Sequence, residues 1–200
     1  MTISEGIIVL REVLEAALLV SLLLSSAMAR GLSRRGVGAG LVLGVIGAAL
    51  VTWLFDFISE SFEGVGQEVF NAVLLGAMAL LLLAYSGFMA ARTARQQSGN
   101  SAPLAIACLV VAMAVTREGV EVFIYIYGFS AVPARLLPVL VGGAMGAGIG
   151  ISLGVLIFYA LISLPARPGA IITQILFALV AAGMASQAVV YLMQGGLIES

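Results

Sequence analysis

The sequence contains no histidine, and all nine of its cations are arginine, with one cysteine among 200 residues. Without histidine, we expect neither a typical zinc or copper site nor the Glu-x-x-His pattern of di-iron oxidases. Without lysine, the G-x-x-x-x-G-K-[ST] loop that binds nucleotide phosphates cannot occur. The single cysteine, Cys108, cannot form an internal disulfide, and we interpret it as a packing residue. We therefore expect no ATP hydrolysis, no enzymatic activity and no bound cofactor.

Charge is also scarce, since only 10% of the residues are charged while 62% are hydrophobic, and the mean hydropathy is +1.18. This composition excludes a soluble globular protein and is typical of a polytopic membrane protein embedded in a lipid bilayer. It leaves no room for a separate soluble domain, so we expect residues 1–200 to form a single membrane domain with no nucleic-acid partner.

The apolar residues form six runs, each long enough to supply the roughly 20 residues that cross a hydrocarbon core. A β-barrel would show short alternating segments instead, so we predict an all-α fold. Pro133 and Pro138 bracket the fourth connection, and Pro165 and Pro168 mark the fifth. The predicted transmembrane helices are residues 4–29, 36–58, 67–91, 103–129, 136–163 and 169–195.

Arginine outside these runs falls mostly on one side of the predicted topology. By the positive-inside rule that side is cytoplasmic, so both termini are predicted to lie outside. The membrane is predicted to be a plasma membrane or a bacterial inner membrane. Arg135 alone falls on the outer side, and the predicted cytoplasmic arginines are Arg30, Arg34, Arg35, Arg92, Arg95 and Arg167.

Two charged pentapeptides interrupt the first and fourth apolar runs. Arg11-Glu12-Val13-Leu14-Glu15 and Arg117-Glu118-Gly119-Val120-Glu121 both read R-E-x-x-E. A charge at the centre of a bilayer costs roughly 2.5–3.5 kcal/mol on insertion scales, so such residues are rare and usually functional.

The two motifs lie 106 residues apart, and the same offset aligns further positions. Tyr85 aligns with Tyr191, and Gly36, Gly40 and Gly44 align with Gly142, Gly146 and Gly150. We predict an internal duplication, with repeat 1 covering about 1–96 and repeat 2 about 102–200. Three spans in each half turn the second half upside down, giving two inverted three-helix repeats. Transporters of this design hold their substrate near the midplane, where the halves meet.

The chemistry of the paired motifs favours a hard cation. Helical spacing places Glu12 and Glu15 on one face, and likewise Glu118 and Glu121. One arginine and two glutamates leave each motif with a net charge of −1. Carboxylate oxygens suit magnesium, calcium, manganese or ferric iron. Arg11 and Arg117 either hold the carboxylates in place or replace the cation when it leaves. Structural ion pairs in a non-transporting scaffold are the alternative.

Other polar residues are weaker candidates. Asp56, Glu60, Glu63 and Glu68 are predicted to gather cations on the outer side, although a solvated loop explains them equally well. Tyr85, Gln187 and Tyr191 are polar positions within apolar runs and are candidates for lining a pathway, with buried hydrogen bonding or interfacial anchoring as the equally supported alternative. Glycine at four-residue spacing permits close helix packing, within one protomer or between protomers of a homo-oligomer.

The paired motifs, the Glu60-x-x-Glu63 segment and Gly66-Gln67-Glu68 before the third span together resemble the high-affinity iron permease family, or iron/lead transporters. The resemblance covers nearly the whole chain. It implies uptake of iron, as ferric ion delivered by an external oxidising partner of the ferroxidase or peroxidase type. The six residues of the two motifs would then form the translocation site. Transport of another cation, such as lead or manganese, and proton-coupled transport through the glutamates remain alternatives.

Overall fold

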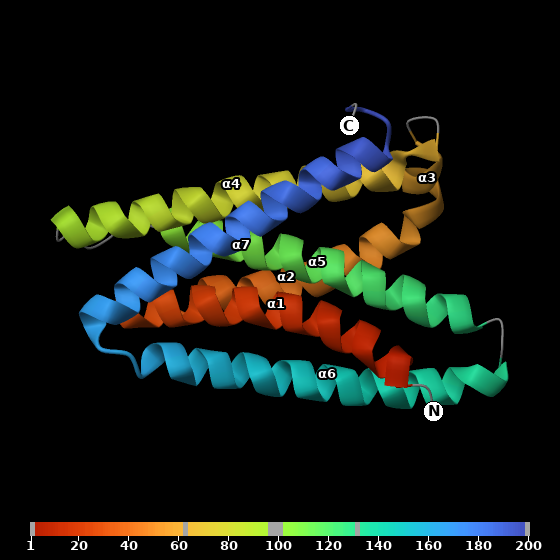
Figure 1. Ribbon diagram of the computed structural model, residues 1–200, viewed down its shortest axis with the longest axis horizontal. Coiled ribbons are helices and arrows are strands. Elements are labelled where there is room, and N and C mark those ends of the chain that lie inside the picture. Colours follow the sequence, from red (N-terminus) through yellow and green to blue (C-terminus); the bar gives the residue numbers. More distant parts are fainter. Residues whose placement is uncertain (1–2, 62–63, 96–101, 131–132, 199–200) are drawn as a thin grey trace.

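The computed structural model describes residues 3–61, 64–95, 102–130 and 133–198, and within these ranges every regular element is a helix (Figure 1). The all-α prediction is therefore confirmed. The helices are α1 (Ile3–Ala29), α2 (Arg35–Trp53), α3 (Phe55–Glu60), α4 (Gly66–Arg95), α5 (Ala102–Ser130), α6 (Pro133–Ile162) and α7 (Ala166–Gln194).

Five of the six predicted spans coincide with one long helix each, but the predicted helix over 36–58 is wrong. α2 ends at Trp53, where Leu54 adopts φ −91° and ψ 9°, and the separate short helix α3 follows. Turning at Leu54 takes the chain out of the apolar layer before its next acidic residues, so that Asp56 and Glu60 stay exposed. Phe55 and Ile58 are half-buried on the inner side of the turn.

The prolines act differently at the last two connections. α6 begins at Pro133 and includes Pro138, so Pro138 does not end the connection as predicted. A proline near the start of a helix removes few backbone hydrogen bonds, because the first N–H groups have no partner within the helix. Pro165 is the N-cap of α7 and Pro168 lies in its first turn, in agreement with a break there.

The long helices pack mainly in three pairs, which are α1 with α6, α2 with α5, and α4 with α7. α1 also packs against α5, so these two helices lie in the interior of the bundle. In Figure 1, α4 and α7 cross on one side of the bundle and α6 lies on the opposite side. The core combines α1, α4, α5 and α7, and it includes Leu22, Met78, Leu82, Val110 and Phe177.

The outward faces of the bundle are apolar, as lipid contact requires. Val42 and Val45 of α2 and Leu156 of α6 each expose more than 60% of their surface. Trp53 and Phe57, beside the break at Leu54, are 80% and 74% exposed. Amphipathic aromatic rings such as tryptophan are typical of the membrane–water boundary.

In the described part of the chain, five helices are long and apolar enough to cross a membrane, namely α2, α4, α5, α6 and α7. α1, which carries the first charged motif, is not among these five. Figure 1 places the start of α1 and the end of α7 at the end of the bundle where α3 lies. The molecule is thus an all-helical protein with several membrane-spanning helices.

Candidate metal site

Glycines allow the two motif helices to approach their neighbours closely. A Cβ added to Gly44 of α2 would lie 2.5 Å from Val115 Cβ of α5. A Cβ added to Gly146 of α6 would overlap the Gly6 carbonyl oxygen of α1. These approaches leave no space for a side chain. The glycine stripes therefore pack the motif helices tightly against α2 and α6.

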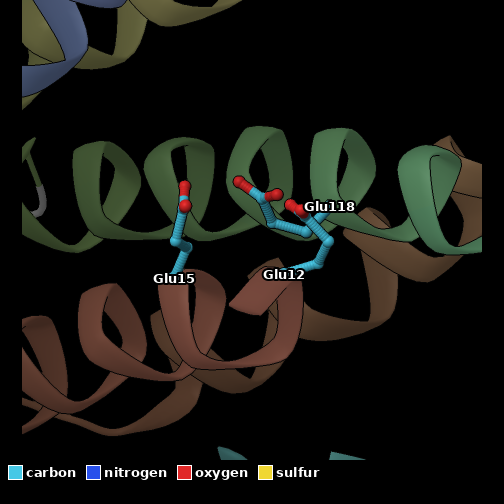
Figure 2. A group of neighbouring side chains, drawn as sticks. All are labelled: Glu12, Glu15 and Glu118. Carbon is cyan, nitrogen blue, oxygen red and sulfur yellow. The ribbon is translucent and has the colours of Figure 1, made fainter. Parts of the chain in front are cut away.

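Three of the four predicted carboxylates converge between α1 and α5. One oxygen each from Glu12, Glu15 and Glu118 lies within 4.8 Å of the other two. Figure 2 shows Glu12 and Glu15 rising from α1 toward Glu118 on α5. These three residues are called the carboxylate cluster below. Because like charges repel at this distance, positive charge placed near the cluster stabilises it.

Burial increases the energetic cost of leaving these carboxylates without a positively charged partner. Glu12 and Glu118 are only 4% and 5% exposed, while Glu15 is half-buried. The Oε2 atoms of Glu12 and Glu118 are buried without a hydrogen-bond partner in the described structure. A buried carboxylate oxygen without a partner is costly, so both atoms are available as ligands for a cation.

Arg117 is the main counter-charge of the cluster. Its guanidinium group is 3% exposed and forms ion pairs with three glutamates. It donates to Glu118 Oε1, lies 2.9 Å from Glu121 Oε1, and lies 3.6 Å from Glu15 Oε2. The Tyr191 hydroxyl of α7 also lies within hydrogen-bonding reach of Arg117. Glu121 thus joins the site through Arg117, although it is not one of the three converging carboxylates.

Arg11 occupies the equivalent position of the first motif in a different environment. Its side chain is 64% exposed, and its Nε donates to Glu15 Oε1 at 3.0 Å. Glu15 therefore connects the two arginines, since it pairs with Arg11 on its own helix and with Arg117 on α5.

A cavity of about 240 Å³ leads from Arg117 and Glu121 toward the α3 end of the bundle. Its polar walls are Gln67 and Asn71 of α4 and Tyr191 of α7, and we call it the vestibule. Tyr191 was a candidate for lining a pathway, and it lines this cavity. Asn71 was missed, although it lies four residues after Gln67 in an otherwise apolar run and therefore on the same helix face.

The other predicted residues lie apart from the cluster. Tyr85 is fully buried, with its ring 5.4 Å from that of Phe177 in an edge-to-face contact. Gln187 is half-buried on α7, and Glu68 is half-buried near the start of α4.

Of the predicted outer acidic residues, Asp56 and Glu60 are exposed on α3, and Glu63 lies outside the described residues. Asp56 lines a second cavity of about 660 Å³ between α2 and α5, together with Trp53 and Gly119.

The fold and the cluster define a class of protein, the polytopic helical membrane proteins with a carboxylate cluster between their helices. More particularly, the chain belongs to the iron permease FTR1 family, which matches it over residues 2–198. The resemblance drawn from the motifs is thereby confirmed.

Individual relatives of the chain are named as iron permeases. A ferrous iron permease EfeU of Escherichia coli O6:H1 is 29% identical over 207 aligned residues, covering 96% of this chain and 74% of the relative. The proteins of that name from Shigella sonnei and Escherichia coli O157:H7 match equally well. No solved structure matches the chain.

Proposed function

We propose that this protein imports iron through the carboxylate cluster, and that its six long helices form two inverted repeats around that cluster. The observation that carries the proposal is the convergence of Glu12, Glu15 and Glu118 between α1 and α5. Two of these residues are buried and have an oxygen without a partner. Buried carboxylate oxygens of this kind are suitable ligands for a hard cation.

The donor set supports iron in the ferric state. All the converging ligands are carboxylate oxygens, which are hard donors that suit a small, highly charged ion. The relatives are named ferrous iron permeases. Both statements hold if ferrous iron is oxidised before it reaches the cluster. An oxidising partner of the ferroxidase or peroxidase type, as the family resemblance implies, would perform that step.

The packing of the helices supports the inverted repeat. In a repeat of this kind α1 is equivalent to α5, and α2 to α6, so the pair α1–α6 is equivalent to α5–α2. These two pairs are indeed among the most extensively packed in the bundle. α4 and α7 are equivalent to each other and pack together.

Burial along α4 and α7 supports the offset of 106 residues. Leu75 and its equivalent Ala181 are both buried, at 1% and 2% exposure. Val73 and its equivalent Leu179 are both 63% exposed. The same faces of the two helices therefore turn inward.

The packing of α2 and α6 favours a slightly different alignment. Gly44 packs against Ala112 and Val115 of α5, whereas Gly146 packs against Gly6 and Leu10 of α1. Ala112 and Gly6 are equivalent residues, so their contact partners Gly44 and Gly146 correspond in the structure. The gap-free alignment instead pairs Gly44 with Gly150, which is four residues further along the chain. A glycine stripe with a four-residue period fits both registers, so sequence alone did not separate them.

The buried guanidinium of Arg117 supports a counter-ion role during transport. Each motif has a formal charge of −1, so the full set of six residues has a charge of −2. When the ion leaves, the ion pairs of Arg117 with Glu15, Glu118 and Glu121 keep part of that charge neutralised. Arg117 would then hold the empty site in a state that can bind the next ion.

The arginine distribution predicts the direction of import. With Arg30, Arg34 and Arg35 on the cytoplasmic side, the α3 end and both termini face outward. The vestibule then opens from the outside toward Arg117 and Glu121, with the exposed Asp56 and Glu60 on the same side.

The decisive experiment measures radioactive iron uptake into proteoliposomes by Glu118→Gln, with Glu60→Gln as a matched control on the exposed helix α3. We expect uptake by Glu118→Gln to fall at least about tenfold, since even outer-shell changes at metal sites typically cost 10–100-fold. Glu60→Gln should retain most of the uptake. Normal uptake by a folded Glu118→Gln protein would contradict the proposal.

An anomalous-scattering map collected at the iron edge provides a second, independent test. We expect one peak between Glu12, Glu15 and Glu118. Comparing ferric with reduced iron in the same uptake assay separates the two oxidation states, and preference for ferrous iron in the absence of any oxidant would contradict the ferric assignment.

A further inference from the structure

When the repeat offset of 106 residues is applied to the polar walls of the vestibule, each wall residue aligns with a residue elsewhere in the bundle. The equivalents of its α4 and α7 walls lie in the halves of α7 and α4 that are farther from α3. The pairs are Arg117 with Arg11, Glu121 with Glu15, Gln67 with Thr173, Asn71 with Phe177, and Tyr191 with Tyr85.

These equivalent positions differ in accessibility. Gln67, Asn71 and Tyr191 are half-buried and line a cavity of about 240 Å³. Their equivalents Thr173, Phe177 and Tyr85 are only 8%, 1% and 0% exposed.

The packed side has a specific closing contact. The rings of Phe177 and Tyr85 meet edge-to-face with centroids 5.4 Å apart, joining α7 to α4. The contact equivalent to Tyr85–Phe177 is Tyr191–Asn71, and both of those residues line the vestibule. An aromatic contact provides few ligands for a hydrated cation, and apolar constrictions close pathways by excluding water.

An inverted repeat explains why one side is open and the other closed. If both halves had the same conformation, the two passages would be alike, and two open passages would form a continuous pore. Carriers built from inverted repeats expose their central site to one side at a time. The difference between the two passages is therefore what such a carrier needs at any one moment.

We propose that Tyr85 and Phe177 form the inner gate of this permease, closing a latent exit passage that is the repeat equivalent of the vestibule. The structure is then the outward-open state, and the inward-open state separates Tyr85 from Phe177 while the vestibule closes between Asn71 and Tyr191. This inference rests on the proposed function, because a gate needs a transport pathway to close.

The test exchanges the residues that differ between the two passages. All variants are made with Cys108→Ala, and each carries one reporter, either Gln67→Cys in the vestibule or Thr173→Cys at the equivalent position. Labelling by a membrane-impermeant maleimide is measured in right-side-out and inside-out vesicles. In the parent, we expect Gln67→Cys to react from one side and Thr173→Cys to be protected from both sides.

Phe177→Asn gives the inner passage the residue found in the vestibule. We expect labelling of Thr173→Cys to rise at least about tenfold, since a buried thiol reacts only in the fraction of molecules whose passage is open. The reaction should occur from the side opposite to that of Gln67→Cys. Phe177→Leu, the control, keeps an apolar contact and should leave Thr173→Cys protected.

Asn71→Phe provides the reciprocal test and does not depend on whether Phe177→Asn folds, because the added ring enters an existing cavity. We expect labelling of Gln67→Cys to slow and iron uptake to fall. The proposal is overturned if Thr173→Cys in the parent reacts as fast as Gln67→Cys, or if folded Phe177→Asn leaves Thr173→Cys protected.

Iron uptake by the parent separates failure of the gate from failure of the function. If the parent imports iron but Phe177→Asn does not change the labelling of Thr173→Cys, the gate is formed by other residues. A parent that imports no iron, with the labelling pattern as expected, has two gated passages but a different cargo.

Discussion

The motif on α1 and the motif on α5 contain the same charged residues at the same spacing, but their arginines have different surroundings. Arg117 is 3% exposed and pairs with three glutamates, whereas Arg11 is 64% exposed and pairs with Glu15. The difference shows that two motifs of the same sequence pattern can have unequal surroundings in one fold. In this conformation the second motif neutralises the cluster, and the first mainly contributes carboxylates.

The largest expected difference follows from removing each arginine. Arg117→Ala leaves three carboxylates without their buried partner, and breaking a buried ion pair costs about 3–5 kcal/mol. Arg11→Ala removes an exposed pair worth about 0.2–1 kcal/mol. The free energy of unfolding in detergent, measured for both variants, tests this order. Equal losses would mean that the two motifs are equivalent and that the observed asymmetry has no energetic weight.

A second comparison concerns the two glycine-rich helices that support the motif helices. A Cβ at Gly40 of α2 would lie 2.6 Å from the Cys108 carbonyl oxygen, whereas a Cβ at Gly38 meets nothing within 4 Å. Gly40→Ala should therefore destabilise by about 1–3 kcal/mol through overpacking. Gly38→Ala should stabilise by up to about 0.8–1 kcal/mol through helix propensity.

The same pair of substitutions can be made on the other side of the bundle. Gly146→Ala of α6 meets the Gly6 backbone, and Gly148→Ala meets nothing within 4 Å. Thermal unfolding of all four variants compares the α2–α5 contact with the α1–α6 contact. If Gly40→Ala and Gly146→Ala are tolerated as well as their controls, close backbone approach does not hold the motif helices in place.

A smaller effect is expected at Ser21, which lies two turns after the first motif. Its hydroxyl group is buried and lies 2.7 Å from the Gly154 carbonyl oxygen of α6. Ser21→Ala should destabilise by about 1 kcal/mol, the usual net contribution of one hydrogen bond. Ser152→Ala, which removes an exposed hydroxyl bonded within its own helix, should change stability by less than about 0.5 kcal/mol. A larger loss from Ser152→Ala would contradict this assignment.

The smallest effect is expected from the exposed acidic residues of α3. The double variant Asp56→Asn and Glu60→Gln should slow iron uptake at low salt by no more than about twofold, because a negative entrance concentrates cations. The difference should shrink as salt is raised, since the Debye length is only about 8 Å at physiological ionic strength. A loss that is insensitive to salt would place these residues in the binding site instead.

Much of the fold follows from the hydropathy pattern, because helices are the economical way to satisfy backbone hydrogen bonds in lipid. The apolar runs therefore gave six long helices. The convergence of Glu12 and Glu118 was also predicted from the sequence, because two copies of one motif on different helices were expected to form a single site. The break at Leu54 could not be predicted, because Trp53, Leu54 and Phe55 continue an apolar run. The only signal near the break is the group of acidic residues that follows it.

The unequal surroundings of Arg11 and Arg117 could not be read from two identical motifs. They depend on how each helix packs, with Arg117 buried beside the cluster and Arg11 on an exposed face of α1. Asn71 was missed for a related reason. At the offset of 106 residues that aligns the two motifs, Asn71 aligns with Phe177, so no matching polar residue drew attention to it.

The exposed ring of Trp53 gives the protein a built-in optical probe. It is the only tryptophan in the sequence, so all indole emission comes from one place at the edge of the apolar layer. Brominated lipids would quench that emission according to the depth of the ring, which measures how the bundle sits in the bilayer without any attached dye. Because Trp53 shares a cavity with Gly119, inside the second motif, the spectrum should also change when α5 moves. Each transport cycle could then be followed by fluorescence in the unmodified protein.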